Sequence, residues 1–242
     1  MTASALFHRV ADSFLPDPPK FIGVAVSGGS DSLALLYLLH DFARDHHVAL
    51  SAATVDHGLR PEAAAEANLV AEICAGLNVP HTVLPWIGWD ARGNLQDEAR
   101  KERYRLLSQW GRVQGLDVIA VGHTADDMAE TFVMRLGRRA GVDGLAAISH
   151  AFERDQMRWV RPLLTSRRIE LQEYLTARDI TWVSDPSNND DKYTRVRVRK
   201  ALAVLSELGI DSMALADVAG NLKSARDALV HHMLMSRRSH FS

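Results

Sequence analysis

The segment from residue 21 to residue 39 constrains the fold more than any other part of the sequence. Residues 22–26 form an apolar, β-branched run that is typical of a buried strand. The sequence Ser27-Gly28-Gly29-Ser30-Asp31-Ser32 follows, and residues 33–39 then carry apolar side chains at helical spacing. A strand, a glycine turn and a helix in this order form the geometry in which backbone N–H groups and a helix start hold a phosphate. We therefore predict a phosphate-binding loop at residues 27–32.

Asp31 indicates which kind of phosphate loop this is. The lysine of the G-x-x-x-x-G-K-[ST] loop is missing from the segment. A carboxylate beside a phosphate repels it unless the carboxylate also holds Mg²⁺ or a reacting amine. The simpler alternative is a tight turn with a serine at the helix N-cap. The preceding strand and Asp31 together favour a phosphate site in which Asp31 holds either Mg²⁺ or a reacting amine.

Composition excludes several classes of protein. The 242 residues suit one sizeable domain with a smaller appendage, and the net charge of −2 argues against indiscriminate coating of nucleic acid. No segment is long and apolar enough for a bilayer span, and the N-terminus lacks a signal-peptide pattern, which predicts a cytoplasmic protein without a membrane partner. The single cysteine, Cys74, excludes an internal disulfide and is expected in a helix as a small core residue.

Strand and helix patterns alternate along the first part of the chain, which predicts an α/β fold with a parallel sheet and helices on both faces. Strands are expected near 21–26, 49–55, 79–84 and 117–121, and helices near 31–44, 62–77, 95–112 and 125–136. In such sheets ligands bind at the carboxyl ends of the strands. The chemistry is therefore expected at residues 27–32, after Val55 and after Val121.

Polar residues occupy these strand ends. Asp56-His57 follows the second strand, and Gly122-His123 follows the fourth. Asp127 and Glu130 lie three residues apart in the next helix and hence on one face. Two carboxylates on one face attract a cation, either Mg²⁺ or the ammonium of a substrate. The alternative is helix N-terminal charge that interacts favourably with the helix dipole.

The region from about 145 to 236 differs in character. We expect a short hairpin over 152–163 with its turn at 153–155, helices near 165–178, 193–207 and 212–235, and a loop over 184–191. A basic cluster follows this loop, formed by Lys192, Arg195, Arg197, Arg199 and Lys200. The arginines at 195, 197 and 199 cannot all share one helix face. The cluster is either a solvated helix face or a surface for a nucleic-acid backbone.

The motifs taken together resemble the tRNA(Ile)-lysidine synthase family of the N-type ATP pyrophosphatase superfamily. The resemblance covers residues 20 to 200 and rests on Ser-Gly-Gly-Ser-Asp-Ser at 27–32, Val-Asp-His-Gly-Leu-Arg at 55–60 and Gly-His-Thr-Ala-Asp-Asp-Met-Ala-Glu-Thr at 122–131. It implies an adenine nucleotide alpha hydrolase-like fold, with a nucleotide-binding domain over 1–145 and a helical, tRNA-contacting region over 146–242. Longer family members continue into C-terminal tRNA-binding domains that have no counterpart in this sequence.

The resemblance also implies a reaction. ATP, with Mg²⁺, would adenylate cytidine 34 in the CAU anticodon of tRNA(Ile), and L-lysine would then attack C2 to give lysidine, which changes decoding from AUG to AUA. The implied ATP site comprises residues 27–32 with Asp56, His57, Gly122 and His123. The implied catalytic residues are Asp31, Asp127, Glu130 and Arg195, with Asp31 as metal ligand and candidate base and with Asp127 and Glu130 binding lysine. The implied tRNA contacts are Arg161, Arg168, Lys192, Arg197, Arg199 and Lys200.

Two other functions are compatible with parts of the pattern. A tRNA thiolase of the same superfamily would need further cysteines for sulfur transfer, and Cys74 alone argues against it. A non-catalytic nucleotide-binding or tRNA-binding module could retain the glycines but would not need Asp31, Asp127 and Glu130 together. A homodimer is compatible with the sequence, which does not specify the oligomeric state.

Overall fold

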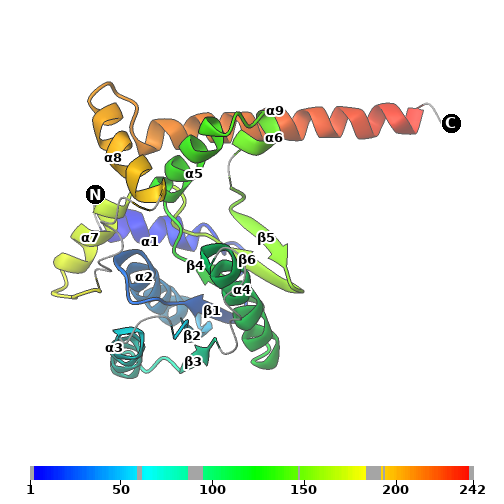
Figure 1. Ribbon diagram of the computed structural model, residues 1–242. Helices are drawn as coiled ribbons and strands as arrows, with labels where there is room; N and C mark the ends of the chain where they lie inside the picture. The colour runs from blue at the N-terminus through cyan, green and yellow to red at the C-terminus, as the bar shows by residue number, and fades with distance from the viewer. Residues whose placement is uncertain are drawn as a thin grey trace. The chain divides into compact units, whose positions relative to one another are not determined.

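The computed structural model describes residues 3–58, 62–86, 95–146, 148–183, 192 and 194–239 (Figure 1). Backbone packing groups the chain into two compact units. Unit 1 comprises Met1–His123 and His150–Asp185, and unit 2 comprises Thr124–Ser149 and Pro186–Ser242. The loop predicted over 184–191 lies outside the described residues. The division into domains 1–145 and 146–242 stays a prediction.

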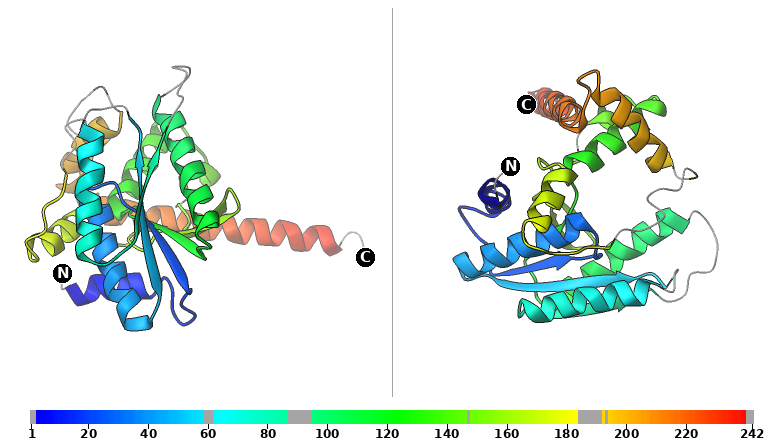
Figure 2. Two further views of the ribbon diagram at one scale, coloured as in Figure 1. Left: turned by 90° about the horizontal axis from the view of Figure 1, so that it is seen from below. Right: turned by 90° about the vertical axis from the view of Figure 1, so that its left-hand side faces the viewer.

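Unit 1 is built on a sheet in which the described residues form six strands (Figure 2). The strands are β1 (Phe21–Ala25), β2 (Ala49–Asp56), β3 (His81–Pro85), β4 (Val118–Val121), β5 (Ala151–Arg154) and β6 (Met157–Val160). Their order is β3-β2-β1-β4-β6-β5, and only β5 pairs antiparallel. The predicted parallel sheet is confirmed. Strand order reverses between β1 and β4, which is the position where open parallel sheets bind ligands.

Helices cover both faces of this sheet, as the sequence predicted. They are α1 (Ala3–Ala11), α2 (Ser30–His46), α3 (Glu62–Gly76), α4 (Leu95–Val113) and α7 (Arg168–Thr176). Crossovers between parallel strands are right-handed. Helices α2 and α3 connect β1 to β2 and β2 to β3, which both run toward the same edge of the sheet, so these helices lie on one face. Helix α4 connects β3 back to β4 in the opposite direction and therefore lies on the other face. Two buried apolar clusters follow this division, one under α1, α2 and α7 and one under α4.

The hairpin expected over 152–163 is present, but its position differs from the prediction. The turn is formed by Asp155 and Gln156, with φ of 51° and 59°, and not by residues 153–155. A two-residue turn with both φ values positive matches the twist of the flanking strands, so Glu153 and Arg154 remain paired in β5. Because β6 pairs with β4, the hairpin extends the sheet of unit 1.

Cys74 occupies the position that the sequence predicted. It lies in α3 with no exposed surface, and burial raises the pKa of its thiol to about 11. At that value the thiol is protonated at neutral pH and is a poor nucleophile. Cys74 therefore serves as a core residue.

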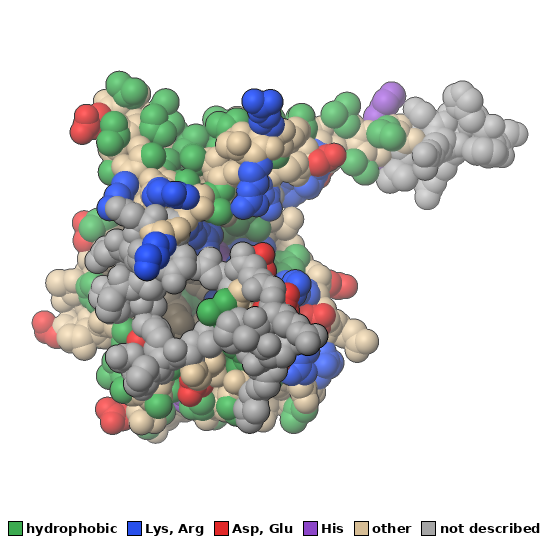
Figure 3. All heavy atoms as spheres, in the orientation of Figure 1, with side chains coloured by type: hydrophobic (Ala, Val, Ile, Leu, Met, Phe, Trp, Pro, Cys, Tyr) green, Lys and Arg blue, Asp and Glu red, His purple; other side chains and the backbone are tan. Residues whose placement is uncertain are grey.

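Unit 2 is helical in its described residues. Its helices are α5 (Ala125–Gly137), α6 (Val142–Leu145), α8 (Thr194–Ser206) and α9 (Ser212–Ser239), with α5 packed on α8 and α9 and α6 packed on α9. Among the described side chains of α8 and α9, those of Val196, Ala216 and Ala219 are buried. Apolar side chains are exposed along α9, including Leu229, Val230 and Met233 (Figure 3). None of the described helices is long and apolar enough to cross a membrane.

Candidate functional site

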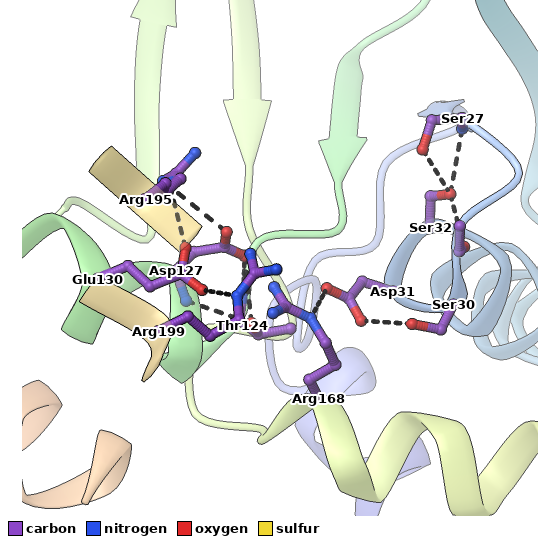
Figure 4. A network of polar contacts seen from close by, with 11 residues as sticks. Ser27, Ser30, Asp31, Ser32, Thr124, Asp127, Glu130, Arg168, Arg195 and Arg199 are labelled. Atoms are coloured by element: carbon purple, nitrogen blue, oxygen red, sulfur yellow. Dashed lines mark hydrogen bonds and ion pairs between the residues drawn. The ribbon is translucent and has the colours of Figure 1, made fainter. Parts of the chain in front are cut away.

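The predicted phosphate loop connects β1 to α2. Gly28 has φ of 85°, a conformation that favours glycine, and Gly29 is the N-cap of α2 without a side-chain hydrogen bond to the helix start. The Ser32 hydroxyl accepts from the Ser27 amide at 3.1 Å and donates to the Gly29 carbonyl at 3.0 Å (Figure 4). The loop is thus braced from within, and the start of α2 carries no side-chain cap. This is the arrangement in which a helix N-terminus binds an anion.

Asp31 has a cationic neighbour. Its Oδ2 lies 2.9 Å from Nε of Arg168, the first residue of α7, and its Oδ1 accepts from the Ser30 hydroxyl at 3.0 Å (Figure 4). The side chains of Asp31 and Arg168 are 17% and 24% exposed. The electrostatic need for a cation beside this carboxylate is therefore met within unit 1. The sequence assigned Arg168 to tRNA binding, and that assignment stays a prediction.

The carboxyl end of β4 lies against this loop. A Cβ at Gly122 would lie 2.9 Å from the backbone oxygen of Asp31, a contact that only glycine avoids. After α7, the Val183 amide donates to the Gly28 carbonyl at 2.9 Å. Two segments that are distant in the sequence therefore contact residues 27–32. The sequence predicted that Gly122 would lie at this edge, but it gave no signal for Val183.

His123 follows Gly122 and contacts an arginine. Nε of Arg161 donates to Nδ1 of His123 at 3.3 Å. Arg161 is only 5% exposed, and its guanidinium lies 3.9 Å from the ring centroid of Phe152. The sequence assigned Arg161 to tRNA binding, which stays a prediction, and the contact with His123 was not expected.

Asp56 and His57 lie at the carboxyl end of β2. An oxygen of Asp56 accepts from the Gly58 amide at 2.8 Å, and the His57 ring meets the Trp86 ring edge-on at 5.6 Å. Burial lowers the pKa of His57 from its usual value, and the charge of Arg103 lowers it further. Nδ1 of His57 is buried and has no hydrogen-bond partner among the described residues. His57 is therefore held neutral and offers a polar atom to a ligand.

Unit 2 holds a second polar cluster, which joins α5 to α8. Glu130 has a side chain that is 1% exposed, with Oε2 at 3.0 Å from Nε of Arg195 and Oε1 at 2.8 Å from Nε of Arg199 (Figure 4). The two arginines are four residues apart and so share one face of α8. Arg197 points elsewhere, is exposed and donates to the Thr194 hydroxyl at 3.2 Å. The exposed basic residues of this region are Lys192, Arg197 and Lys200.

Asp127 has a structural role that sequence reasoning missed. Thr124 is the N-cap of α5, and Asp127 completes a capping box in which its Oδ2 accepts from the Thr124 amide at 3.0 Å. Oδ1 of Asp127 lies 3.9 Å from Nη2 of Arg195. The signal was present as Thr-x-x-Asp before an apolar run, a variant of the Ser/Thr-x-x-Glu capping box. One oxygen of Asp127 thus serves the helix, and the other faces a cation.

Comparison with known proteins gives the family. A model described as a PP-loop domain matches residues 3–208. A tRNA(Ile)-lysidine synthase of Zymomonas mobilis is 39% identical over 93% of this chain and 68% of its own length. The chain belongs to the tRNA(Ile)-lysidine synthase family of PP-loop proteins.

Other members of the tRNA(Ile)-lysidine synthase family are longer than this chain. The relative from Ruegeria pomeroyi is 48% identical over 98% of this chain but 56% of its own length. The relative from Rhodopseudomonas palustris is 42% identical over 86% of the chain and 61% of its own length. The chain therefore spans about six tenths of the length of these curated relatives.

Solved structures show the same fold at low identity. A U34-tRNA thiolase from Methanococcus maripaludis has a TM-score of 0.77 at 16% identity and covers 95% of this chain and 78% of its own. An NH₃-dependent NAD synthetase from Campylobacter jejuni has a TM-score of 0.52 at 13% identity, over 93% of this chain and 96% of its own. These likenesses establish the fold and, at such identities, nothing about the substrate.

Because Arg195 and Arg199 pair with Glu130 from one face of α8, we predict that substitutions on this face lower the free energy of unfolding more than those on the exposed face. We expect Arg199→Met to lower the free energy of unfolding by about 1–3 kcal/mol, because the buried carboxylate of Glu130 loses its ion pair with Arg199. Arg197→Met, two residues away and exposed, is the matched control and should change stability by less than about 0.5 kcal/mol. Urea unfolding of the two variants measures the difference. Equal stability would remove the ion pair as a stabilising feature.

Proposed function

We propose that the chain is an ATP-dependent ligase that joins L-lysine to C2 of cytidine 34 in the CAU anticodon of tRNA(Ile) by way of an adenylated cytidine. The observation that carries the proposal is membership of the tRNA(Ile)-lysidine synthase family. The phosphate loop with Asp31 at the point where strand order reverses agrees with it. A cytoplasmic location follows from a tRNA substrate and belongs to the same proposal.

In this proposal ATP binds in unit 1. Backbone N–H groups at the start of α2 and the hydroxyls of residues 27–32 hold the phosphates, since that helix start has no side-chain cap. Asp56, His57, Gly122 and His123 contact the remainder of the nucleotide. The buried Nδ1 of His57, which lacks a partner among the described residues, supports this assignment.

Mg²⁺ belongs to the proposal as a partner of ATP. The described residues contain no group of three or more His, Cys, Asp or Glu side chains placed to hold a metal ion. One carboxylate is nevertheless enough when phosphates supply the other ligands, which is the usual form of a Mg²⁺–nucleotide site. Asp31 would be that carboxylate, and Mg²⁺ would neutralise charge on the phosphates.

Lysine recognition is assigned to Asp127 and Glu130. The two carboxylates are already neutralised by two guanidinium groups, those of Arg195 and Arg199. An incoming ammonium would therefore add an uncompensated positive charge unless one arginine turned away. Arg195 is the candidate, because its side chain is 43% exposed and contacts both carboxylates. A released guanidinium can take an anionic group of a substrate, which is the catalytic role we assign to Arg195.

The lysine-transfer reaction itself is the direct test. Purified protein should incorporate radiolabelled lysine into tRNA(Ile) transcripts in the presence of ATP and Mg²⁺ and should release AMP and pyrophosphate in step with lysine. A thiolase would instead require a sulfur donor and further cysteines, and the chain has one cysteine. A non-catalytic module would bind tRNA or nucleotide without lysine-dependent AMP release. Homodimerisation stays a prediction, which light scattering tests.

Three exposed basic residues of unit 2, Lys192, Arg197 and Lys200, are proposed to contact the tRNA backbone. Replacing Lys192, Arg197 and Lys200 together by Gln should weaken tRNA binding and reduce the slope of log affinity against log salt. The slope should fall by roughly one for each phosphate that the variant no longer neutralises. ATP affinity should be unchanged, because none of the three residues is assigned to the nucleotide. Filter binding across a salt series measures both the affinity and the slope.

The matched control removes the same charge from unit 1. Arg44, Lys101 and Arg105 are 64%, 64% and 57% exposed in their side chains and form ion pairs with neighbouring carboxylates. Their triple Gln variant should retain the wild-type slope. If the unit 2 variant also keeps that slope, its basic residues only solvate a helix, and the tRNA surface must lie elsewhere.

A further inference from the structure

We propose that Arg161 is a positioning residue that fixes the tautomer of His123, so that His123 presents an Nε2–H donor to the bound nucleotide. The identity of the ligand rests on the proposed function, whereas the tautomer does not. The inference concerns unit 1 alone.

The contact between the two side chains sets the direction of the hydrogen bond. A guanidinium has only donors, so the 3.3 Å contact from Nε of Arg161 makes Nδ1 of His123 the acceptor. Nδ1 must then carry a lone pair, and the proton of the neutral imidazole resides on Nε2. In an imidazolium, Nδ1 would also carry a hydrogen, which would face the Nε–H of Arg161. The charged form of His123 is therefore disfavoured. His123 is therefore held neutral with its N–H on the far side of the ring.

Arg161 is fixed well enough to act in this way. Its guanidinium lies over Phe152, which stacks on Trp159 at 6.0 Å between ring centroids, and Trp159 has no exposed surface. Burial lowers the pKa of Arg161 from its usual value. The usual pKa of arginine lies so far above neutral pH that the side chain remains a cation after this lowering. The donor is thus both permanent and immobile.

His123 directly follows the glycine that lies against the phosphate loop. Its amide donates to the Val121 carbonyl at 3.0 Å, which folds the chain tightly at the end of β4. The preceding residue, Gly122, touches the backbone of Asp31. A phosphate or ribose oxygen bound near this loop would accept a hydrogen bond from an N–H group. An imidazole lone pair in the same position would repel an anion. With Nδ1 engaged by Arg161, His123 is a donor and not a general base.

Two substitutions at one bond position separate the hydrogen bond from packing. Arg161→Gln places an amide N–H at the same number of bonds from the backbone as Nε, and Arg161→Met places a methyl group there. Arg158→Met is the matched control, because Arg158 is exposed and lies on β6, the strand that Arg161 directly follows. Protein with ¹⁵N-labelled histidine is compared by NMR, and His123→Gln assigns the signals of His123.

We expect wild type, Arg158→Met and Arg161→Gln to show His123 predominantly as the Nε2–H tautomer at neutral pH. Arg161→Met should show both tautomers and should bind ATP about tenfold more weakly by calorimetry, the value of one hydrogen bond. An Nδ1–H tautomer or an imidazolium in wild type overturns the proposal. An unchanged tautomer in Arg161→Met overturns it as well.

The two parts of the experiment also separate this proposal from the proposed function. If Arg161→Met shifts the tautomer while its ATP affinity equals that of Arg158→Met, Arg161 has no role toward the nucleotide and the proposal is wrong. If wild type binds no ATP at all, the proposed ATP site fails, while the tautomer result still decides what Arg161 does to His123. The wild-type spectrum remains decisive even where Arg161→Met does not fold.

Discussion

Replacing Asp31 by Asn is expected to reduce lysidine formation by about a thousandfold, or ~4 kcal/mol in the barrier, without unfolding the protein. Asn has the same shape and can still accept the hydroxyl of Ser30, but it carries no charge for Arg168 or for Mg²⁺. The helix start would then face the phosphates beside an uncompensated Arg168. Measured with saturating tRNA, lysine and ATP, the loss should appear in AMP release as well as in lysine incorporation.

The fold should tolerate this change. The side chains of Asp31 and Arg168 are partly exposed, so the loss of the pair should cost about 1–2 kcal/mol of stability and leave the protein folded. Asp45→Asn is the matched control: it lies on the same helix, is 46% exposed and pairs with Arg44. The control should keep wild-type activity. Activity of Asp31→Asn within about threefold of wild type, under ~1 kcal/mol, would remove Asp31 from the mechanism.

The sheet and its helices were predictable because their signals are local and strong. Each of the four strands and four helices expected between residues 21 and 137 is present, with ends within two residues of the prediction. Buried parallel strands are continuous apolar runs, and the intervening helices have clear periodicity, so the two patterns are readily separated. The position of the phosphate loop followed from the same alternation.

Elements that depend on tertiary packing or on backbone conformation were missed or misplaced. Helix α1 is nine residues long and was not predicted, although its buried residues Leu6, Val10 and Ala11 stand at helical spacing. The helix predicted over 165–178 begins later, at Arg168, because a capping interaction between Arg167 and Glu170 fixes the start of α7. The hairpin turn depends on positive φ at Asp155 and Gln156, two residues without glycine's usual signal.

The positions of several candidate site residues were predictable from the sequence, but their pairings were not, and their roles stay predictions. Asp31, Gly122 and His123 follow from motif positions at strand ends, whereas Arg168 and Arg161 reach them from more than 30 residues away in the sequence. Sequence spacing does not specify which cation meets which carboxylate across such distances. The basic pattern at 195–199 shows the same limit, since helical spacing separates Arg197 from the other two arginines but does not reveal Glu130 as their partner.

Replacing Asp127 by Asn is expected to lower kcat/KM for lysine by about a hundredfold, or ~2.7 kcal/mol, within the range of a hydrogen bond to a charged group. An amide oxygen can still accept from the Thr124 amide, so the capping box of α5 is preserved while the negative charge is lost. In the proposed site the lysine ammonium would then meet Glu130 alone, and Glu130 keeps Arg199 as a partner after Arg195 has turned away. Adenylation of the tRNA in the absence of lysine should continue at the wild-type rate.

Two comparison variants determine whether Asp127 acts through its charge. Asp127→Ala removes the cap as well and should lose about 1 kcal/mol of stability in addition to lysine affinity. Asp143→Asn removes one exposed carboxylate from α6 in the same unit and should leave the lysine KM unchanged. If Asp127→Asn abolishes adenylation together with lysine transfer, Asp127 serves ATP and not lysine. If Asp127→Asn leaves the lysine KM unchanged, the carboxylate is only a helix cap, and Glu130 with its arginines must account for lysine selection.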